Sequence, residues 1–217
     1  MESTQSTTDR LIELCAVAVI RAEEPEIAMR AAHALVQGGV KALEITMTVP
    51  GAIDVIREMT AAETDAVIGA GTVLTSDEVE RCADAGARFI VSPVCIEEVV
   101  RAARALDLVV MPGAFTPTEA FTAWQWGADF VKVFPAARLG PRYLGDLLAP
   151  LPNIRLVPTG GITADNAGEY LAAGASLLGL GSWLVNPPPG ANGVEDEILA
   201  RARQLTAAIG DLRGENA

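Results

Sequence analysis

The chain has 217 residues, half of them hydrophobic, and a formal net charge of -12 at pH 7. This length predicts one domain with a large core, and the acidic balance argues against nucleic acid or an anionic membrane as a partner. There is no run of 18 uncharged apolar residues, so we expect no membrane span. Residues 1–9 are polar and lack the apolar segment of a secretory signal, so we expect a flexible N-terminus followed by a single domain over residues 10–213.

The numbers and positions of cysteine and histidine limit which catalytic and metal-binding chemistry the chain can perform. Cys15, Cys82 and Cys95 are odd in number and lack CxxC spacing, which is typical of reduced thiols in the cytoplasm rather than of disulfides or a zinc site. The only histidine, His33, lies in an apolar periodic stretch and is interpreted as a packing or surface residue. We therefore expect no metal, and acid–base chemistry must come from carboxylates, lysine, tyrosine or water.

Short apolar runs alternate with longer segments of helical period along the chain. A lead-in helix is predicted over 10–14. Strands are predicted at 15–20, 42–46, 66–70, 89–91, 108–111, 130–134, 154–157 and 177–180. Helices are predicted at 25–36, 50–59, 75–85, 96–106, 116–126, 141–148, 164–173 and 195–212. Eight strands, each followed by a helix, predict an α/β fold of the (β/α)8 TIM barrel type. The alternative, a doubly wound open sheet, would need a glycine-rich turn after the first strand, and residues 20–24 do not provide one.

The predicted strand 130–134 contains an unusual lysine. The chain has 14 arginines and only two lysines, Lys41 and Lys132, and Lys132 lies in the middle of an apolar run. Strand alternation places it on one face with Phe130 and Phe134. A buried ammonium without a partner costs several kcal/mol unless it sheds its proton, and a neutral amine in an apolar pocket is a nucleophile suited to Schiff-base chemistry. The alternative is a strand-end lysine that reaches water or pairs with a carboxylate.

A carboxylate is predicted to face this lysine. In a TIM barrel the active site lies at the C-terminal ends of the strands. Alternation puts Glu44 on the face opposite Leu43 and Ile45, and even-numbered strands feed the same interior layers. Glu44 and Lys132 can therefore meet across the barrel, either as a structural ion pair or as a base and a nucleophile.

Two glycine turns indicate an anion site. Thr159, Gly160 and Gly161 follow the seventh strand, and Gly181 and Ser182 follow the eighth. Loops at these places form the usual phosphate site of a barrel, because glycines let backbone N–H groups approach the oxygens. Each turn alone is equally well explained without a ligand, and their joint placement favours phosphate binding.

Other strand ends offer further contacts for an anionic ligand. Arg21 ends the first strand, where it either binds a substrate carboxylate or bridges nearby surface acids. Thr72 follows the third strand and offers a hydroxyl close to accessible backbone. Pro93 shapes the exit of the fourth strand, and it is placed with Phe134 among the substrate-binding candidates.

Motifs on nearly every strand resemble one family. They are Phe-Val-Lys-Val-Phe-Pro at 130–135, Leu-Glu-Ile-Thr-Met-Thr-Val-Pro at 43–50, Gly-Ala-Gly-Thr-Val at 69–73, Val-Ser-Pro at 91–93, Pro-Gly at 112–113, Thr-Pro-Thr-Glu at 116–119 and Pro-Thr-Gly-Gly-Ile at 158–162. Together they resemble the KDPG/KHG aldolases, the class I aldolases of 2-dehydro-3-deoxy-phosphogluconate and 4-hydroxy-2-oxoglutarate. The resemblance covers about residues 10 to 185.

The resemblance implies a (β/α)8 barrel, usually a homotrimer, with no metal or organic cofactor. By position, Lys132 resembles the Schiff-base lysine and Glu44 the general acid and base. Arg21 and Thr72 resemble the residues that hold the carboxylate of the pyruvate half, and the two glycine turns resemble the phosphate end. One position departs from the pattern, because some members carry Arg where this chain has Thr48.

The implied reaction is cleavage of 2-dehydro-3-deoxy-6-phosphogluconate to pyruvate and glyceraldehyde 3-phosphate, with 4-hydroxy-2-oxoglutarate, cleaved to pyruvate and glyoxylate, as a second substrate. Residues 139–143 also resemble the branch that acts on the galactonate epimer. Two other hypotheses stay open. One is a phosphate-binding isomerase or epimerase without a covalent intermediate, and the other is a non-catalytic barrel that serves as an assembly subunit.

Overall fold

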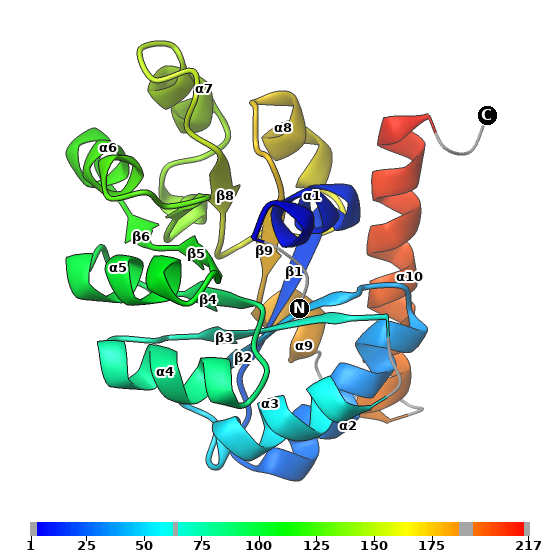
Figure 1. Cartoon of the computed structure of the whole chain (residues 1–217). Coiled ribbons are helices and arrows are strands. Elements are labelled where there is room, and N and C mark those ends of the chain that lie inside the picture. Colours follow the sequence, from blue (N-terminus) through cyan, green and yellow to red (C-terminus); the bar gives the residue numbers. More distant parts are fainter. Residues whose placement is uncertain (1–3, 63–64, 187–192, 215–217) are drawn as a thin grey trace.

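The computed structural model of the protein describes residues 4–62, 65–186 and 193–214. Parallel strands occupy the centre and helices surround them (Figure 1). The strands are β1 Ala16–Ile20, β2 Ala42–Thr46, β3 Val67–Gly71, β4 Phe89–Val91, β5 Val109–Met111, β6 Gly113–Ala114, β7 Val131–Val133, β8 Leu156–Pro158 and β9 Leu178–Leu180. The helices are α1 Thr4–Leu14, α2 Pro25–Gln37, α3 Ala52–Ala61, α4 Ser76–Asp84, α5 Glu97–Ala105, α6 Pro117–Gln125, α7 Arg142–Leu148, α8 Ala167–Ala172, α9 Ser182–Val185 and α10 Val194–Arg213, with a 3-10 turn at Ala136–Arg138.

The strands form two parallel sheets. One has six strands in the order β5-β4-β3-β2-β1-β9, and the other has three in the order β6-β7-β8. Pro112 separates β5 from β6, so the predicted fifth strand ends at Met111 and a short further strand follows it. Single bridges join Leu156 to Ala175 and Thr159 to Gly179. The predicted TIM barrel is therefore confirmed in its coarser form, an α/β fold with a parallel half-barrel sheet and a smaller three-stranded sheet.

The alternation predicted for the strands is observed. Leu43 and Ile45 of β2 belong to the apolar layer between strands and helices, whereas Ala42 belongs to an inner cluster enclosed by the strands. The other members of this inner cluster are Leu11, Val17, Phe89, Val91, Val109, Met111, Phe130, Val157 and Leu177. Glycines with positive φ follow four of the outer helices, at Gly39, Gly86, Gly127 and Gly174, as expected of helix C-termini.

Helix α1 covers the end of the sheet where the strands begin, which we call the base (Figure 1). It begins at Thr4, six residues before the predicted start of the lead-in helix at residue 10, and residues 1–3 lie outside the described residues. Thr4, Thr7 and Thr8 are buried, and Leu11 joins the inner cluster. Burial against the base explains why the polar residues 4–9 are helical, since tertiary packing contributes more to helix stability than the weak helix propensity of these residues.

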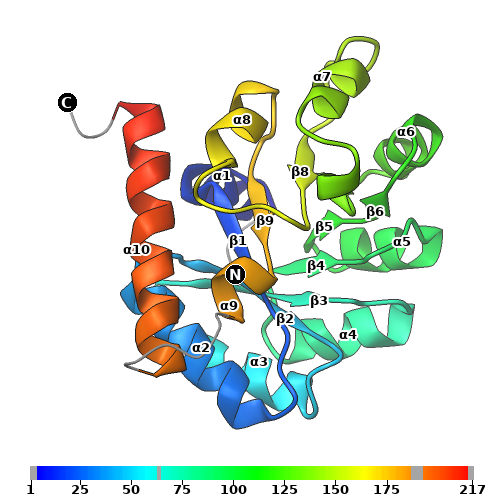
Figure 2. The same cartoon turned by 180° about the vertical axis from the view of Figure 1, so that it is seen from behind.

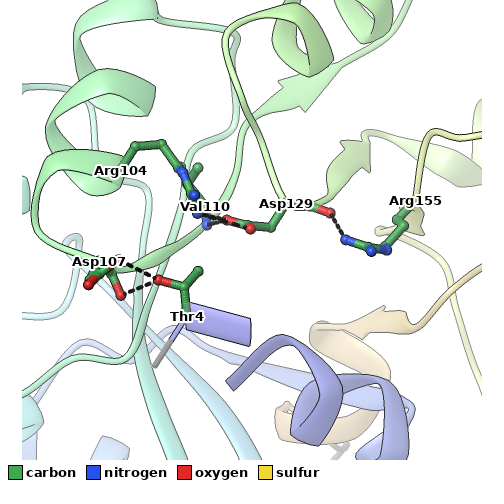
Figure 3. Close-up of polar contacts among 6 residues, drawn as sticks. All are labelled: Thr4, Arg104, Asp107, Val110, Asp129 and Arg155. Carbon is green, nitrogen blue, oxygen red and sulfur yellow. Dashed lines mark hydrogen bonds and ion pairs between the residues drawn. The ribbon is translucent and has the colours of Figure 1, made fainter. Parts of the chain in front are cut away.

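Polar contacts tie the base together (Figure 3). The Thr4 hydroxyl donates to the Asp107 carbonyl oxygen over 2.8 Å. The Asp129 carboxylate accepts the Val110 N–H over 2.9 Å and the Arg104 guanidinium over 3.1 Å. The Arg155 guanidinium donates to the Asp129 carbonyl oxygen over 3.3 Å. These bonds join α1, α5 and the strands β5, β7 and β8 at one end of the molecule.

The opposite ends of the strands, which we call the mouth, carry the loops. Helix α9, which the sequence did not predict, directly follows β9 (Figure 2). Thr116 and Glu119 form a capping box at the start of α6, where they exchange side-chain to backbone hydrogen bonds. None of the helices in the described ranges has the length and apolar character needed to cross a bilayer.

Candidate active site

Lys132 lies on the inner face of β7. Its neighbours Val131 and Val133 face the helix layer, while Phe130 is fully buried in the inner cluster. The Lys132 N–H donates to the Pro112 carbonyl oxygen over 2.9 Å, which fixes the strand beside the end of β5. Only 6% of the residue is exposed. The predicted burial of this lysine is confirmed.

Glu44 reaches the lysine from β2. Its Oε1 lies 3.6 Å from Lys132 Nζ, and the residue is 3% exposed. This distance is too long for a good hydrogen bond, and Glu44 Oε1 has no hydrogen-bond partner among the described residues. A buried carboxylate oxygen without a partner is costly, so the pair leaves room for a further donor between carboxylate and amine.

A glycine on the neighbouring strand makes space for this carboxylate. A Cβ atom at Gly71 of β3 would lie 2.0 Å from Glu44 Oε1. Gly71 pairs in register with Thr46, two residues beyond Glu44 on the neighbouring strand. Sequence reasoning singled out the Gly-Ala-Gly segment but did not assign this role, because only the pairing register shows what a side chain there would meet.

A cavity of about 530 Å³ opens at the mouth. Every site residue predicted from the sequence except Glu44 lines it, namely Arg21, Thr72, Pro93, Lys132, Phe134, Thr159, Gly160, Gly161, Gly181 and Ser182. The remaining lining residues are Val19, Thr48, Ile162, Trp183, Val185 and Asn186. This lining contains two cationic side chains and no carboxylate, so the cavity suits an anionic ligand although the whole chain is acidic.

Arg21 and Thr72 meet on one side of the cavity. Arg21 Nη2 lies 3.5 Å from Thr72 Oγ1, and the guanidinium is otherwise exposed. Thr72 has a positive φ of 59°, which is uncommon for a threonine and turns the chain sharply after β3. An unpaired guanidinium beside a hydroxyl is suited to a carboxylate, which it can bind through two parallel hydrogen bonds.

The glycine turns form another part of the cavity wall. Gly160 and Gly161 have φ values of 92° and 80°, so side chains are disfavoured at both. A Cβ at Gly161 would also lie 2.5 Å from that of Ala137. The turn after β9 is supported by Arg201 of α10, whose guanidinium donates to the Trp183 carbonyl oxygen and lies 5.6 Å from the Trp183 ring.

The other candidate nucleophiles do not compete with the lysine. Burial raises the pKa of the Cys82 thiol to about 12, and burial also raises the pKa of Cys95. Both thiols are therefore mostly protonated near neutral pH and poorly nucleophilic. His33 is exposed on α2 and does not line the cavity. The cavity thus contains an amine with a buried carboxylate behind it, a pair that is chemically suited to act as a nucleophile and a base.

Comparison with known proteins decides the family. A model of KDPG and KHG aldolases matches residues 7–199 of the chain. The chain belongs to the KDPG/KHG aldolase family. It is 38% identical over 196 residues to a probable 2-dehydro-3-deoxy-6-phosphogalactonate aldolase of Rhizobium meliloti (strain 1021), covering 89% of this chain and 92% of that relative.

Two further members of the KDPG/KHG aldolase family are also similar. The KHG/KDPG aldolase of Escherichia coli (strain K12) is 36% identical over 189 residues, covering 87% of this chain and 89% of that relative. A solved structure of the KDPG aldolase from Legionella pneumophila, with pyruvate captured at low pH as a covalent carbinolamine intermediate, has a TM-score of 0.78 and 29% identity and covers 94% of this chain and 97% of that one.

Family membership makes the protein an aldolase and hence a carbon–carbon lyase. Its relatives carry both the phosphogluconate and the phosphogalactonate names. Of the lining residues that sequence reasoning left out as site candidates, Thr48 lies in the turn after β2, whereas Trp183 and Asn186 belong to the α9 segment. The α9 residues had no periodic signal, because this helix is a single turn between a strand and a loop.

Proposed function

We propose that this protein is a class I aldolase that cleaves 2-dehydro-3-deoxy-6-phosphogluconate to pyruvate and glyceraldehyde 3-phosphate. In this proposal Lys132 is the Schiff-base nucleophile and Glu44 is the general acid and base. The observation that carries it is the buried contact of 3.6 Å between Lys132 Nζ and Glu44 Oε1 beside an anion-compatible cavity. A purely structural pair would be expected to satisfy the carboxylate, whereas Glu44 Oε1 has no hydrogen-bond partner among the described residues.

The mechanism follows from the positions of the two groups. The neutral Lys132 amine attacks the C2 ketone and forms a carbinolamine, and protonated Glu44 gives its proton to the carbinolamine hydroxyl, which leaves as water to give an iminium. Glu44, acting through a water molecule, removes the proton of the C4 hydroxyl. The electron pair of the C3–C4 bond then moves into the iminium, so that the aldehyde leaves and an enamine remains. Glu44 returns a proton to C3, and hydrolysis of the iminium releases pyruvate and the amine.

The two ends of the cavity suit the two anionic groups of such a substrate. Arg21 and Thr72 offer a guanidinium and a hydroxyl for the carboxylate. On the other side, the turns at Gly160, Gly161 and Gly181 support the assignment of the phosphate. Pro93 and Phe134 supply apolar walls, and Lys132 Nζ lies 5.6 Å from the centre of the Phe134 ring.

Borohydride trapping of pyruvate tests the assignment, and the chain supplies its own control. Because Lys41 is the only other lysine, the adduct has two possible side-chain sites. Lys41 is ion-paired with Asp65, away from the cavity lining. We expect trapping by the wild-type chain and by Lys41→Arg, and none by Lys132→Arg or Lys132→Ala. Trapping that persists in the Lys132 variants contradicts the assignment.

The same assay separates the remaining hypotheses. An isomerase or epimerase would show no adduct in the wild-type chain and would tolerate Lys132→Arg better than an aldolase. A non-catalytic assembly subunit would show neither an adduct nor turnover. A wild-type adduct that maps to Lys132 by peptide mass spectrometry supports the aldolase.

The galactonate epimer is the second candidate substrate. It is favoured by the relative from Rhizobium meliloti, which is 38% identical and named for that epimer. Residues 139–143 also resemble the galactonate branch. Cleavage rates for the gluconate and galactonate substrates, measured side by side with 4-hydroxy-2-oxoglutarate, decide the preference. A higher kcat/KM for the galactonate epimer than for the gluconate epimer would make the galactonate epimer the preferred substrate.

We further infer that the two sheets close into one eight-stranded barrel and that the chain forms a homotrimer in the cytoplasm. The bridges between residues 156 and 175 and between 159 and 179 support closure. Val94 and Phe115 are each more than 40% exposed and line one shallow hollow of about 370 Å³, which favours burial against another copy. Light scattering tests the trimer, and a monomer in solution would contradict it.

A further inference from the structure

Helix α9 forms part of the cavity wall although it is only one turn long. It spans Ser182–Val185, and the residues on either side of it, Gly181 and Asn186, also line the cavity. Within the turn, the Leu184 N–H donates to the Gly181 carbonyl oxygen over 2.9 Å. A single turn is not stable in isolation, because it fixes several residues for few hydrogen bonds. The position of this part of the wall therefore depends on contacts from outside α9.

The start of α9 lies beside the glycine turn that follows β8. The bridge between Thr159 and Gly179 joins the end of β8 to β9. A Cβ at Gly179 would lie 2.2 Å from Thr159 Oγ1, so the two segments approach as closely as a glycine allows. Gly160 and Gly161 follow the first segment, and Gly181 follows the second. The two turns therefore lie next to each other, on the side of the cavity assigned to the phosphate.

Arg201 of α10 contacts α9 in two ways. Its Nη1 donates to the Trp183 carbonyl oxygen, and its guanidinium carbon lies 5.6 Å from the centre of the Trp183 ring. The last carbonyl groups of a helix lack partners within the helix, and here an arginine supplies the donor for one of them. Glu197, one turn earlier on α10, orients the guanidinium by accepting from its Nε over 2.9 Å. The Arg201 side chain is only 17% exposed, so these contacts are largely shielded from solvent.

Helix α10 is held in place by contacts that do not involve α9. A Cβ at Gly38, directly after α2, would lie 2.3 Å from the Cβ of Ala202, so the two helices pack closely there. The Thr206 hydroxyl donates to the Gly38 carbonyl oxygen over 3.3 Å. Near the end of α10, Arg213 donates to the Ile12 carbonyl oxygen over 2.8 Å. Arg201 therefore connects the single turn of α9 to a firmly packed helix.

We propose that Arg201 is a positioning residue for the phosphate end of the active site. The proposal rests on the proposed aldolase function, in which the glycine turns bind the substrate phosphate. Through the Trp183 carbonyl group and ring, Arg201 fixes α9 and with it the turn at Gly181. Displacement of this turn weakens phosphate binding but leaves the amine on β7 and the carboxylate on β2 in place. Arg201 thus contributes to the preference for phosphorylated substrates and not to the Schiff-base chemistry.

Aldol addition of pyruvate to two matched aldehydes tests this role. Glyceraldehyde 3-phosphate and glyceraldehyde differ only in the phosphate, and the readout is the ratio of kcat/KM for the first to kcat/KM for the second. For Arg201→Leu we expect this ratio to fall about tenfold, the lower end of what a hydrogen bond to a charged group contributes. Arg203→Leu is the matched control, because it removes the same charge from an exposed position of α10, and it should keep the wild-type ratio.

Two further variants test the geometry of the contact. Arg201→Lys keeps the charge but loses the planar fork that binds and stacks at once, so it should also lower the ratio. Glu197→Gln weakens the orienting contact and should lower the ratio a few-fold. In the Arg201→Leu background, Glu197→Gln should lower it no further, because both changes act through the same guanidinium.

The outcomes separate this role from a purely structural one and from the aldolase function. An unchanged ratio in Arg201→Leu, or equal losses with both aldehydes, overturns the positioning role. If circular dichroism shows that Arg201→Leu does not fold, the ratio of Arg201→Lys decides by the same criteria. A wild-type chain that traps pyruvate but adds it equally well to both aldehydes would overturn the phosphate assignment and this proposal with it. A wild-type chain that traps no pyruvate would instead refute the aldolase function itself.

Discussion

The mouth and the base of the sheet interior use the same strand face for different purposes. The change from base to mouth takes two residues around β7. Phe130, directly before this strand, is fully buried in the inner cluster, and Lys132 on the same face lines the cavity. The base is filled by aliphatic and aromatic side chains from the strands and by Leu11 of α1. The interior thus stabilises the fold at one end and holds reactive groups at the other, so mutations should separate stability from activity.

The two regions also differ in how they satisfy polar groups. At the base, the Asp129 carboxylate has the Val110 N–H and Arg104 as donors. In the described ranges two buried side-chain atoms lack a hydrogen-bond partner, Thr8 Oγ1 in α1 and Glu44 Oε1 at the mouth. Glu44 keeps its contact of 3.6 Å with Lys132, so the mouth holds a buried carboxylate without a good hydrogen bond to this oxygen, whereas the base supplies Asp129 with donors at 2.9 and 3.1 Å.

The largest effect is expected from a change that disturbs only the mouth. In Gly71→Ala the new Cβ would lie 2.0 Å from Glu44 Oε1 and must displace the carboxylate from Lys132. Loss of a positioned general acid and base typically lowers a rate by about 10² to 10⁴-fold. We expect a fall in kcat of this size in the cleavage assay, with the circular dichroism of the wild-type chain retained.

A double variant sharpens this prediction. Glu44→Gln removes the carboxylate chemistry without changing its shape. If Gly71→Ala acts by moving Glu44, the double variant should be no slower than Glu44→Gln alone, because the two changes remove the same interaction. Additive losses in kcat would mean that Gly71→Ala acts on another part of the site.

A change at the base should lower the stability of the fold. Phe130→Ala empties a fully buried position and should lower the free energy of unfolding by about 3–5 kcal/mol. Phe134→Ala is the matched control, because Phe134 lies on the same strand face but is 40% exposed, and its cost should be below about 1 kcal/mol. Urea unfolding of both variants measures the difference. Similar costs for the two phenylalanines would contradict the division between base and mouth.

Much of this fold follows from local patterns. Each predicted strand overlaps an observed one, because short apolar runs between helical segments form buried strands in an α/β chain. Two features escaped prediction for tertiary reasons. The polar residues 4–9 are helical because they pack on the base, and α9 is too short to show a period. The division into two sheets depends on hydrogen bonds around Pro112, which composition does not reveal.

The site was predictable to the extent that it depends on strand alternation. Alternation alone brought Glu44 and Lys132 to one interior, and the structure places them 3.6 Å apart. The catalytic and binding roles of the predicted residues stay predictions. The space that Gly71 leaves for Glu44 depends on strand register, which the period of the sequence does not encode.

The smallest expected effect is a pH dependence at the base. Burial raises the pKa of Asp129, although the Val110 N–H and Arg104 oppose the shift. A carboxyl with a raised pKa in the folded state binds protons more readily there than in the unfolded chain, so its contribution to stability is present at low pH and is lost as the pH rises through the folded pKa. Asp129→Asn cannot titrate, so the unfolding free energy of the wild type minus that of the variant should fall as the pH rises above about 4, the pKa of an unperturbed aspartate. Arg104→Gln in the wild-type background removes the positive charge that opposes the shift, so the unfolding free energy should then fall more with rising pH. If the difference between wild type and Asp129→Asn instead rises with pH, the ion pair with Arg104 outweighs the effect of burial.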